Sequence, residues 1–325
     1  MGQTLSEPVV EKHTTEDEDE RIAYGASAMQ GWRISMEDAH TTILKMDGPS
    51  GKHISFFAVY DGHGGPNVAK YSGAEVHQRI AQEESFAKGD YQAALKAGFL
   101  GTDDDLRADA SFQHDPSGCT AVAVLITDDW RIIVANAGDS RAVLSANGTV
   151  VPLSFDHKPV NPEESQRISA AGGFVEFGRV NGNLALSRAI GDFEFKQNTN
   201  LPAEQQVVTA NPDITERQLL DTDEFVVVAC DGIWDCMSNQ EVVDFVRKKI
   251  AQGVDIPQIC EAIMDHCLAP DSELGGVGCD NMTVVIMALL KGRTKQQWAQ
   301  EVASKVQLTD DASPNGAKPA SPTKS

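Results

Sequence analysis

The stretch FFAVYDGHGG (residues 56–65) says most about the fold of this chain. Residues 54–60 form a continuous apolar run, which is long enough for a buried strand. The run stops at Asp61-Gly62, a dipeptide that commonly turns or ends a strand. His63 follows in a Gly-flanked loop. The pattern predicts a strand whose end presents an acidic side chain on a rigid support.

Further strand patterns lie on both sides of this stretch. Residues 121–126 and 131–135 are two β-rich runs around a polar turn, and residues 141–145 follow after Ala137-Gly138-Asp139. Residues 224–229 and 282–290 are apolar runs that lie beside Asp231 and Asp280. Because the strands come in runs and do not alternate strictly with helices, we predict an α+β fold with antiparallel sheets.

Helical patterns are fewer. Ser238 with Glu241 three residues later has the signature of a capping box, and Asn161 before Pro162 is typical of a helix start. The predicted helices cover residues 67–81, 162–171, 238–250 and 256–267, with a short amphipathic helix at 296–306.

Composition excludes some classes of function. The 325 residues carry a net charge of −21, which argues against binding to nucleic acid, where basic surfaces dominate. The six cysteines include no CxxC pair, so zinc-ribbon spacing is absent and reduced thiols of a cytoplasmic or nuclear protein are expected. No apolar run approaches the roughly 20 residues of a membrane span.

The two ends differ from the middle. We expect residues 1–20, which are polar and acidic, to be disordered, and residues 310–325 to form a flexible tail. The start MGQTLS fits the pattern for N-myristoylation at Gly2. A single acyl chain followed by the acidic run at 16–20 predicts, at most, weak and reversible membrane contact.

Four acidic residues share one context, the edge of an apolar strand beside Gly or Asn: Asp61, Asp139, Asp231 and Asp280. Glu37-Asp38 in SMEDAH adds two more carboxylates. Taken singly, each has a plain structural alternative as a turn, cap or surface residue. Carboxylates gathered in one place repel one another unless cations neutralise them, and Mg²⁺, Mn²⁺ and Ca²⁺ prefer such oxygen ligands. The repeated context therefore favours a metal site.

Two other side chains suit phosphate chemistry. His63, two residues after Asp61, is a candidate general acid, and Arg33 could bind a phosphate group through its forked guanidinium. No cysteine is followed by an Arg at the spacing of cysteine-dependent phosphatases, so a metal-activated water is the better nucleophile. None of the acidic stretches has the spacing of an EF-hand.

From about residue 24 to residue 290 the sequence resembles the PP2C family of metal-dependent serine/threonine protein phosphatases, most of all its fungal and animal branch. The resemblance rests on these motifs: GWRISMEDAH (31–40), FFAVYDGHGG (56–65), SGCTAVAVLI (117–126), VANAGDSRAVL (134–144), DHKPVNPEE (156–164), AAGGFV (170–175), RVNGNLALSRAIGD (179–192), VVVACDGIWD (226–235) and GCDNMTVV (278–285). It implies a central sandwich of two antiparallel sheets, flanked by helices on both outer faces in four αββα layers. The phosphatase domain would span residues 21–292, with a flap at about 160–200 beside the cleft, and residues 293–325 would follow it as a short helix and tail.

The resemblance also implies a role for each candidate residue. Two Mg²⁺ or Mn²⁺ ions would share a bridging water that attacks phosphorus, Arg33 would bind phosphate and His63 would protonate the departing Ser or Thr oxygen. The expected metal ligands are Asp61 between the ions, Asp231 and Asp280 on one ion, Glu37 and the Gly62 carbonyl on the other with Asp38 close behind, and Asp139 and Asp235 for a weaker third ion. Asn281 would support these ligands.

Family resemblance further suggests phosphoprotein substrates, among them stress-pathway or cell-cycle kinases, and a monomer. The main alternative is a pseudophosphatase that only binds such proteins. We disfavour it because every expected ligand is present. A two-metal nuclease is disfavoured by the acidic charge.

Overall fold

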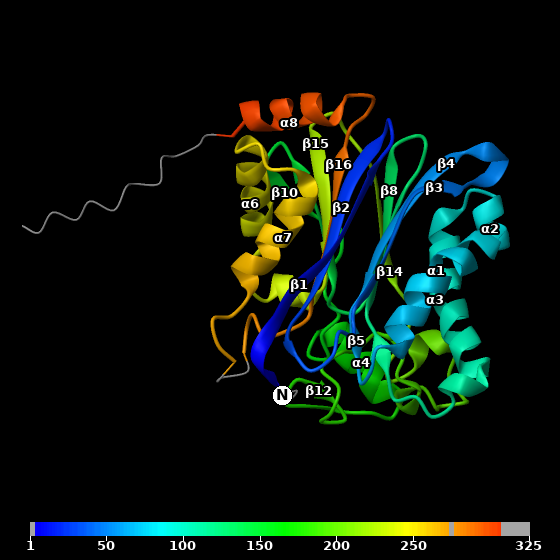
Figure 1. Ribbon diagram of the computed structural model, residues 1–325. Helices are drawn as coiled ribbons and strands as arrows, with labels where there is room; N and C mark the ends of the chain where they lie inside the picture. The colour runs from blue at the N-terminus through cyan, green and yellow to red at the C-terminus, as the bar shows by residue number, and fades with distance from the viewer. Residues whose placement is uncertain (1–3, 273–275, 307–325) are drawn as a thin grey trace, which may run out of the picture.

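The computed structural model describes residues 4–272 and 276–306. Two antiparallel sheets lie face to face in the middle of the molecule (Figure 1). The first has the order β1-β2-β16-β15-β9-β10 and the second has the order β14-β8-β7-β4-β3. Small two-residue strands, β5, β6 and β13, form a separate ribbon at the end of the sandwich where α4 and β12 also lie.

The strands have the following bounds in chain order: β1 Thr4–Glu18, β2 Ile22–Arg33, β3 Ala39–Asp47, β4 His53–Tyr60, β5 Gly62–His63, β6 Gly118–Cys119, β7 Ala121–Ile126, β8 Arg131–Ala137, β9 Arg141–Ala146, β10 Thr149–Pro152, β11 Val175–Glu176, β12 Arg179–Val180, β13 Ile190–Gly191, β14 Asp213–Gln218, β15 Asp223–Ala229 and β16 Met282–Leu289. The helices are α1 Asn67–Gln82, α2 Glu84–Ala87, α3 Tyr91–Ala108, α4 Pro162–Ala170, α5 Asp231–Trp234, α6 Asn239–Ala251, α7 Ile256–Cys267 and α8 Lys295–Ser304.

Strand β4 shows why the central strands are continuously apolar. Its Phe57 and Val59 point into the core between the sheets, whereas Phe56, Ala58 and Tyr60 point outward into a second core. That outer core is formed with α1 and α3. A strand covered on both faces has no position that suits a polar side chain, so the usual in-out alternation is lost.

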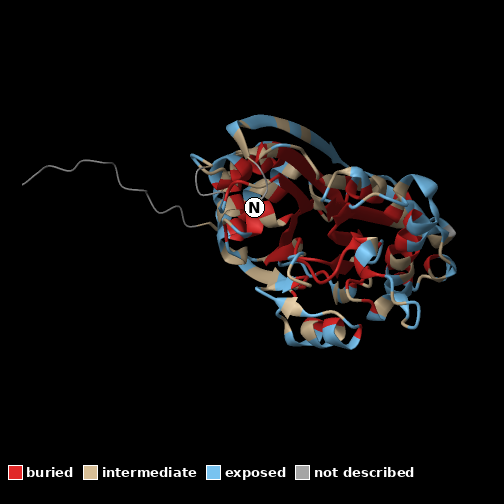
Figure 2. Ribbon diagram, turned by 90° about the horizontal axis from the view of Figure 1, so that it is seen from below, coloured by how far each residue is buried: buried red, intermediate tan, exposed pale blue. Residues whose placement is uncertain are grey.

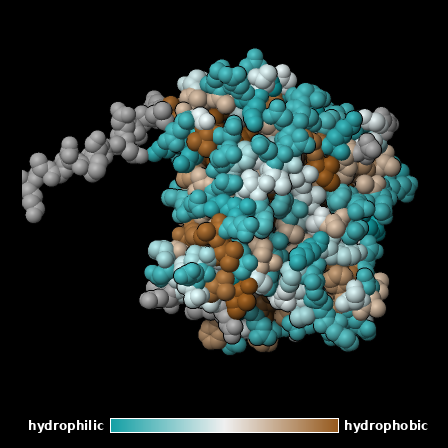
Figure 3. Space-filling view, viewed as in Figure 1, coloured by the Kyte–Doolittle hydropathy of each residue, from teal (hydrophilic) through white to brown (hydrophobic). Residues whose placement is uncertain are grey.

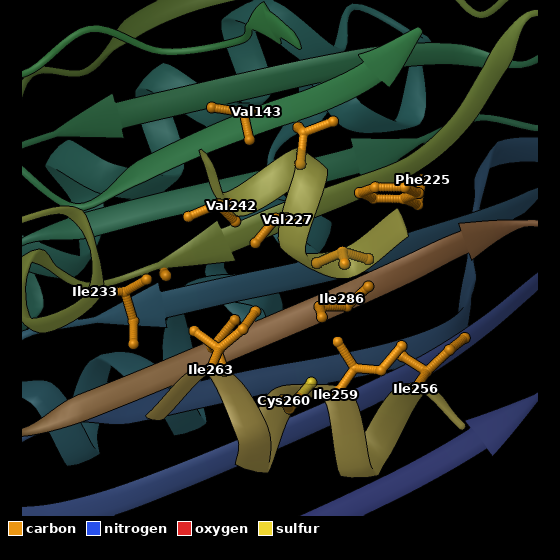
Figure 4. Packing of buried hydrophobic residues seen from close by; sticks show 14 of the residues in the cluster. Val143, Phe225, Val227, Ile233, Val242, Ile256, Ile259, Cys260, Ile263 and Ile286 are labelled. Carbon is orange, nitrogen blue, oxygen red and sulfur yellow. The ribbon is translucent and has the colours of Figure 1, made fainter. Parts of the chain in front are cut away.

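Helices α6, α7 and α8 cover the outer face of the other sheet. Figure 4 shows Ile259 and Ile263 of α7 and Val242 of α6 packed over Val227 and Ile286 of the sheet. Together with α1 and α3 on the opposite side, these helices complete the four αββα layers, as predicted. Figure 2 shows the buried residues concentrated along the sheets and the inward faces of the helices.

The predicted helices agree with the structure to within a residue or two at most ends. Ser238 and Glu241 form the capping box at the start of α6. Asn161 precedes α4 but its side chain makes no capping bond, because its amide donates to the Asp156 carbonyl at 2.9 Å. Helix α3 was not predicted, although it has 18 residues. Its two glycines, Gly98 and Gly101, pack closely against Ile80 and Arg79 of α1.

The prediction that residues 1–20 are disordered is wrong for the residues that the structure describes. Residues Thr4–Glu18 form β1, which pairs with β2 along the edge of the sheet. Most of its side chains are exposed, so its pairing rests on main-chain hydrogen bonds and a few side-chain contacts. Thr14 Oγ1 donates to Glu261 at 2.7 Å, and Lys12 lies 2.6 Å from Asp265 of α7. Gly2 and the tail at 307–325 lie outside the described residues.

On the face seen in Figure 3, hydrophilic residues cover most of the surface and apolar residues gather in a few patches. Within residues 4–272 and 276–306, no helix combines the length and apolar character that a membrane span requires.

Candidate metal centre

The predicted acidic residues meet at one end of the sandwich because each follows or precedes a central strand. Asp61 comes directly after β4, Asp231 begins α5 two residues after β15, and Asp280 lies two residues before β16. Glu37 and Asp38 lie in the connection between β2 and β3. The two sheets therefore both contribute carboxylates to the same rim.

All of these residues except Asp38 line a cleft with a volume of about 480 Å³. The sequence-predicted residues among its lining are Arg33, Glu37, Asp61, Gly62, His63, Asp139, Asp231, Asp280 and Asn281. Asp38 is buried behind the cleft wall, and Asp235 lies one helical turn beyond Asp231, bonded through its backbone N–H to the Asp231 carbonyl at 2.8 Å. The structure thus brings together the predicted set, with Asp38 and Asp235 outside the lining.

The donor atoms are spaced closely enough for shared ions. Carboxylate oxygens of Asp61, Asp139 and Asp231 all lie within 4.8 Å of one another, and Asp61 forms a second such group with Asp38 and the Cys230 thiol. Asp38 Oδ2 accepts a hydrogen bond from Thr283 Oγ1 at 2.7 Å, but its buried Oδ1 has no partner among the described residues. An unpartnered buried carboxylate oxygen beside further carboxylates fits a divalent cation with oxygen ligands.

The electrostatics agree with that fit. Burial and the charges of Asp231 and Asp38 raise the pKa of Asp61 well above its usual value. Burial, with Asp139 and Asp280 nearby, raises the pKa of Asp231 to about 8. Carboxylates held this close together are costly as anions unless positive charge is supplied, which a divalent cation does.

Backbone contacts fix the loop that carries Glu37. Gly62 packs so closely on the Glu37 carbonyl that a side chain at position 62 would overlap it. Asn281 Oδ1 accepts from the Glu37 backbone N–H at 2.9 Å, and Asn281 Nδ2 donates to the carbonyls of Gln30 and Ser35 at 2.8 and 3.0 Å. Asn281 therefore joins the end of β2 and the Glu37 loop to the start of β16.

Arg33, the predicted phosphate-binding residue, makes an ion pair with Asp280 at the cleft wall. Its side chain is 40% exposed, so the guanidinium group faces the cleft and solvent as well as its partner.

His63 has a partner that the sequence did not predict. Its Nε2 lies 2.7 Å from Asp192 Oδ2, and Asp192 is buried in the left-handed backbone region at φ 51°. Gly118 leaves room for this pair, because a side chain there would meet both partners. Burial works to lower the pKa of His63, but the charge and hydrogen bond of Asp192, with Asp139 and Glu37, outweigh it and the pKa is raised. The only signal in the sequence was the final Asp of the motif at 179–192.

Asp139 likewise has an unpredicted neighbour. The Lys158 ammonium group makes an ion pair with Asp139 Oδ2. Arg179, Leu184 and Leu186, from the segment predicted to form the flap, also line the cleft.

Comparison with known proteins accounts for this arrangement. Residues 22–274 match the family model described as protein phosphatase 2C. The chain belongs to the protein phosphatase 2C family. It is 59% identical over 307 residues to protein phosphatase 2C homolog 2 of Aspergillus flavus, covering 91% of this chain and 70% of that protein. It is 55% identical over 311 residues to homolog 3 of Schizosaccharomyces pombe, covering 95% and 75%.

A solved structure shares the fold. The crystal structure of a phosphatase from a pathogenic strain of Toxoplasma gondii superimposes with a TM-score of 0.74 at 27% identity, covering 86% of this chain and 96% of that one. Membership of this metal-dependent family identifies the chain as a protein serine/threonine phosphatase, an enzyme whose substrates are phosphoproteins. The acidic cluster is the part of the described chain that suits the metal.

Proposed function

We propose that the protein hydrolyses phosphoserine and phosphothreonine with the help of two Mg²⁺ or Mn²⁺ ions held by the acidic cluster. The observation that carries this proposal is the grouping of Asp61, Asp139 and Asp231, whose carboxylate oxygens lie within 4.8 Å of one another in the lining of the cleft. When bound, such ions make water a nucleophile near neutral pH and neutralise charge on the phosphoryl group. In this proposal Asp61 would help to hold both ions.

The remaining ligands are those that the family resemblance implies. Asp231 and Asp280 would hold one ion, and Glu37 and the Gly62 carbonyl the other, with Asp38 behind them. Glu37 is oriented for this by Ser35 Oγ, which donates to its Oε1 at 2.7 Å, and by the Gly65 N–H at 3.2 Å from its Oε2. Asp139 and Asp235 would hold a weaker third ion.

Arg33 would bind the phosphate group of the substrate. In the structure its guanidinium donates to Asp280, a proposed ligand. If Asp280 served as a metal ligand, its attraction for Arg33 would be weaker, and the planar donors of Arg33 would be available to phosphate oxygens.

His63 would donate a proton to the Ser or Thr oxygen as it leaves. The Asp192 carboxylate, 2.7 Å from His63 Nε2, orients the ring and favours its protonated form. A protonated imidazole is a suitable acid for an alkoxide, which is a poor leaving group on its own.

The leaving group provides the test of this assignment. We expect His63→Gln to lower the rate on a phosphothreonine peptide by about 10²-fold or more, because the threonine oxygen needs a proton. The same variant should lose far less activity on p-nitrophenyl phosphate, whose leaving group departs without one. Equal losses on both substrates would contradict the general-acid role. Activity that survives removal of divalent ions by EDTA would contradict the proposed metal centre.

We further propose that the protein acts as a monomer in the cytoplasm or nucleus on substrates such as stress-pathway or cell-cycle kinases. A myristoyl group on Gly2 would add weak, reversible membrane contact. Mass spectrometry of the N-terminal peptide and size-exclusion chromatography would test the lipid and the monomer. An unmodified Gly2 or a stable dimer would reject the respective part.

A further inference from the structure

Lys158 is a cation that the chain itself supplies to the acidic cluster. Its ammonium group lies against Asp139 Oδ2, and Asp139 in turn lies within 4.8 Å of Asp61 and Asp231. The segment that carries Lys158 comes from outside the central strands, between β10 and α4. The ammonium group therefore reaches the cluster as a separate structural element.

The backbone around Lys158 is held firmly against the Asp139 loop. The neighbouring His157 is buried, its N–H donates to the Gly138 carbonyl at 2.9 Å, and its Nδ1 accepts from the Gly138 N–H at 3.2 Å. The other ring nitrogen of His157 lies 3.0 Å from Asp213 Oδ2. These bonds hold His157, the residue directly before Lys158, in place. From this anchored position the Lys158 side chain reaches Asp139.

The two partners differ in how freely they can separate. The Asp139 side chain is only 5% exposed and is fixed at the end of β8, whereas the Lys158 side chain is 39% exposed. A second pair in the same protein, Lys196 with Asp103, is 2% and 7% exposed, and its ammonium also donates to the Ala189 carbonyl at 2.7 Å. The Lys196 pair is locked, but the Lys158 ammonium can move into water while Asp139 stays in place.

We propose that the Lys158 ammonium group competes with a divalent cation for Asp139, and so weakens the binding of the third ion. This inference rests on the proposed metal centre. An ion that binds Asp139 competes with the ammonium for the charge of this carboxylate and also meets the repulsion of a neighbouring positive charge. Lys158 would thus keep this site weak while the ions that do not use Asp139 bind tightly.

Binding of Mn²⁺ to the metal-stripped full chain, followed by the electron paramagnetic resonance signal of free Mn²⁺, tests the proposal without relying on activity. We expect Lys158→Met to tighten the weakest class of bound Mn²⁺ by about tenfold or more, because a competing charge is removed. Lys158→Arg, which keeps the charge, should bind like the wild type. Lys12→Met, which also removes one cation from an ion pair but on β1, is the matched control for net charge.

Adding Asp139→Asn to Lys158→Met should abolish the gain, which identifies the carboxylate concerned. If Lys158→Met does not fold, Lys158→Gln replaces it with a polar side chain of similar length. An unchanged weak class in the folded variant, or a gain that survives Asp139→Asn, would overturn the inference while leaving the proposed function intact. A wild-type protein that binds no Mn²⁺ would overturn both.

Discussion

Replacing Asn281 with Ala should separate the positioning of the metal ligands from simple stability. Asn281 is buried, and the substitution removes three hydrogen bonds: one from the Glu37 N–H and two to the carbonyls of Gln30 and Ser35. At about 1 kcal/mol for each bond, we expect the free energy of unfolding to fall by about 3 kcal/mol.

The larger consequence should be at the metal centre. Without Asn281 the Glu37 loop loses one of its two links to the start of β16, and the hydrogen bond from Thr283 to Asp38 is left to hold it. Glu37 and Gly62 are then held less firmly in register with Asp280. Loss of a residue that supports metal ligands typically weakens binding 10- to 100-fold, and we expect a loss of about that size in Mn²⁺ affinity. Urea denaturation measures the stability, and Mn²⁺ titration of the metal-stripped protein measures the affinity.

Gln206 offers a matched control. It is also buried and also makes three hydrogen bonds, accepting from the Asn198 N–H at 3.1 Å and donating to the carbonyls of Asn198 and Leu201 at 2.8 and 2.9 Å. It is not among the residues that line the cleft. Gln206→Ala should lose similar stability and keep its Mn²⁺ affinity. If the two variants lose affinity equally, or neither loses any, the positioning role of Asn281 is refuted.

Three further predictions concern charge and the sheet edge. Burial works to raise the pKa of Glu164, but its ion pairs with Arg188 and Arg167 outweigh this and lower it to about 2. The ion pairs therefore stabilise the fold fully above the pKa of Glu in the unfolded chain, about 4.3, and this stabilisation is lost as pH falls toward 2. The free energy of unfolding, measured in urea, should fall more steeply over this pH range for the wild type than for Glu164→Gln. Deleting residues 1–18 should lower the melting temperature by several degrees, because it removes β1 from the edge of β2; an unchanged value would fit a disordered segment instead. Without divalent ions, Asp61→Asn should be more stable than the wild type by about 1–2 kcal/mol, because a buried carboxylate that its neighbours repel is gone. Added Mn²⁺ should stabilise only the wild type. A metal-free variant that is less stable than the wild type would contradict this prediction.

The sequence predicted the central strands and most helices because these elements carry strong local patterns. β4 is apolar on both faces, and α6 begins with a capping box that needs only Ser238 and Glu241. β1 carries no such pattern, since main-chain pairing with β2 holds it and its side chains mostly face water. Polar composition alone cannot distinguish an exposed edge strand from a disordered segment.

The candidate site shows the same division. The carboxylates beside strand ends could be predicted, because the end of a strand fixes where its neighbour lies. The partners of these groups could not. Asp192 is 129 positions from His63 and meets it through a left-handed turn, and Lys158 reaches Asp139 from the segment before α4. Such pairs depend on how distant loops pack, which no local pattern records.

Hydrolysis of a phosphothreonine peptide by the purified full chain tests the central claim most directly. The protein is stripped with EDTA, resupplied with Mn²⁺ or Mg²⁺, and compared with Asp61→Asn and Asp231→Asn variants whose folding is verified by circular dichroism. The account predicts turnover that EDTA abolishes, that either ion restores in the wild type, and that neither ion restores in the variants. Turnover in EDTA, or full activity in a variant that lacks Asp61, would contradict it.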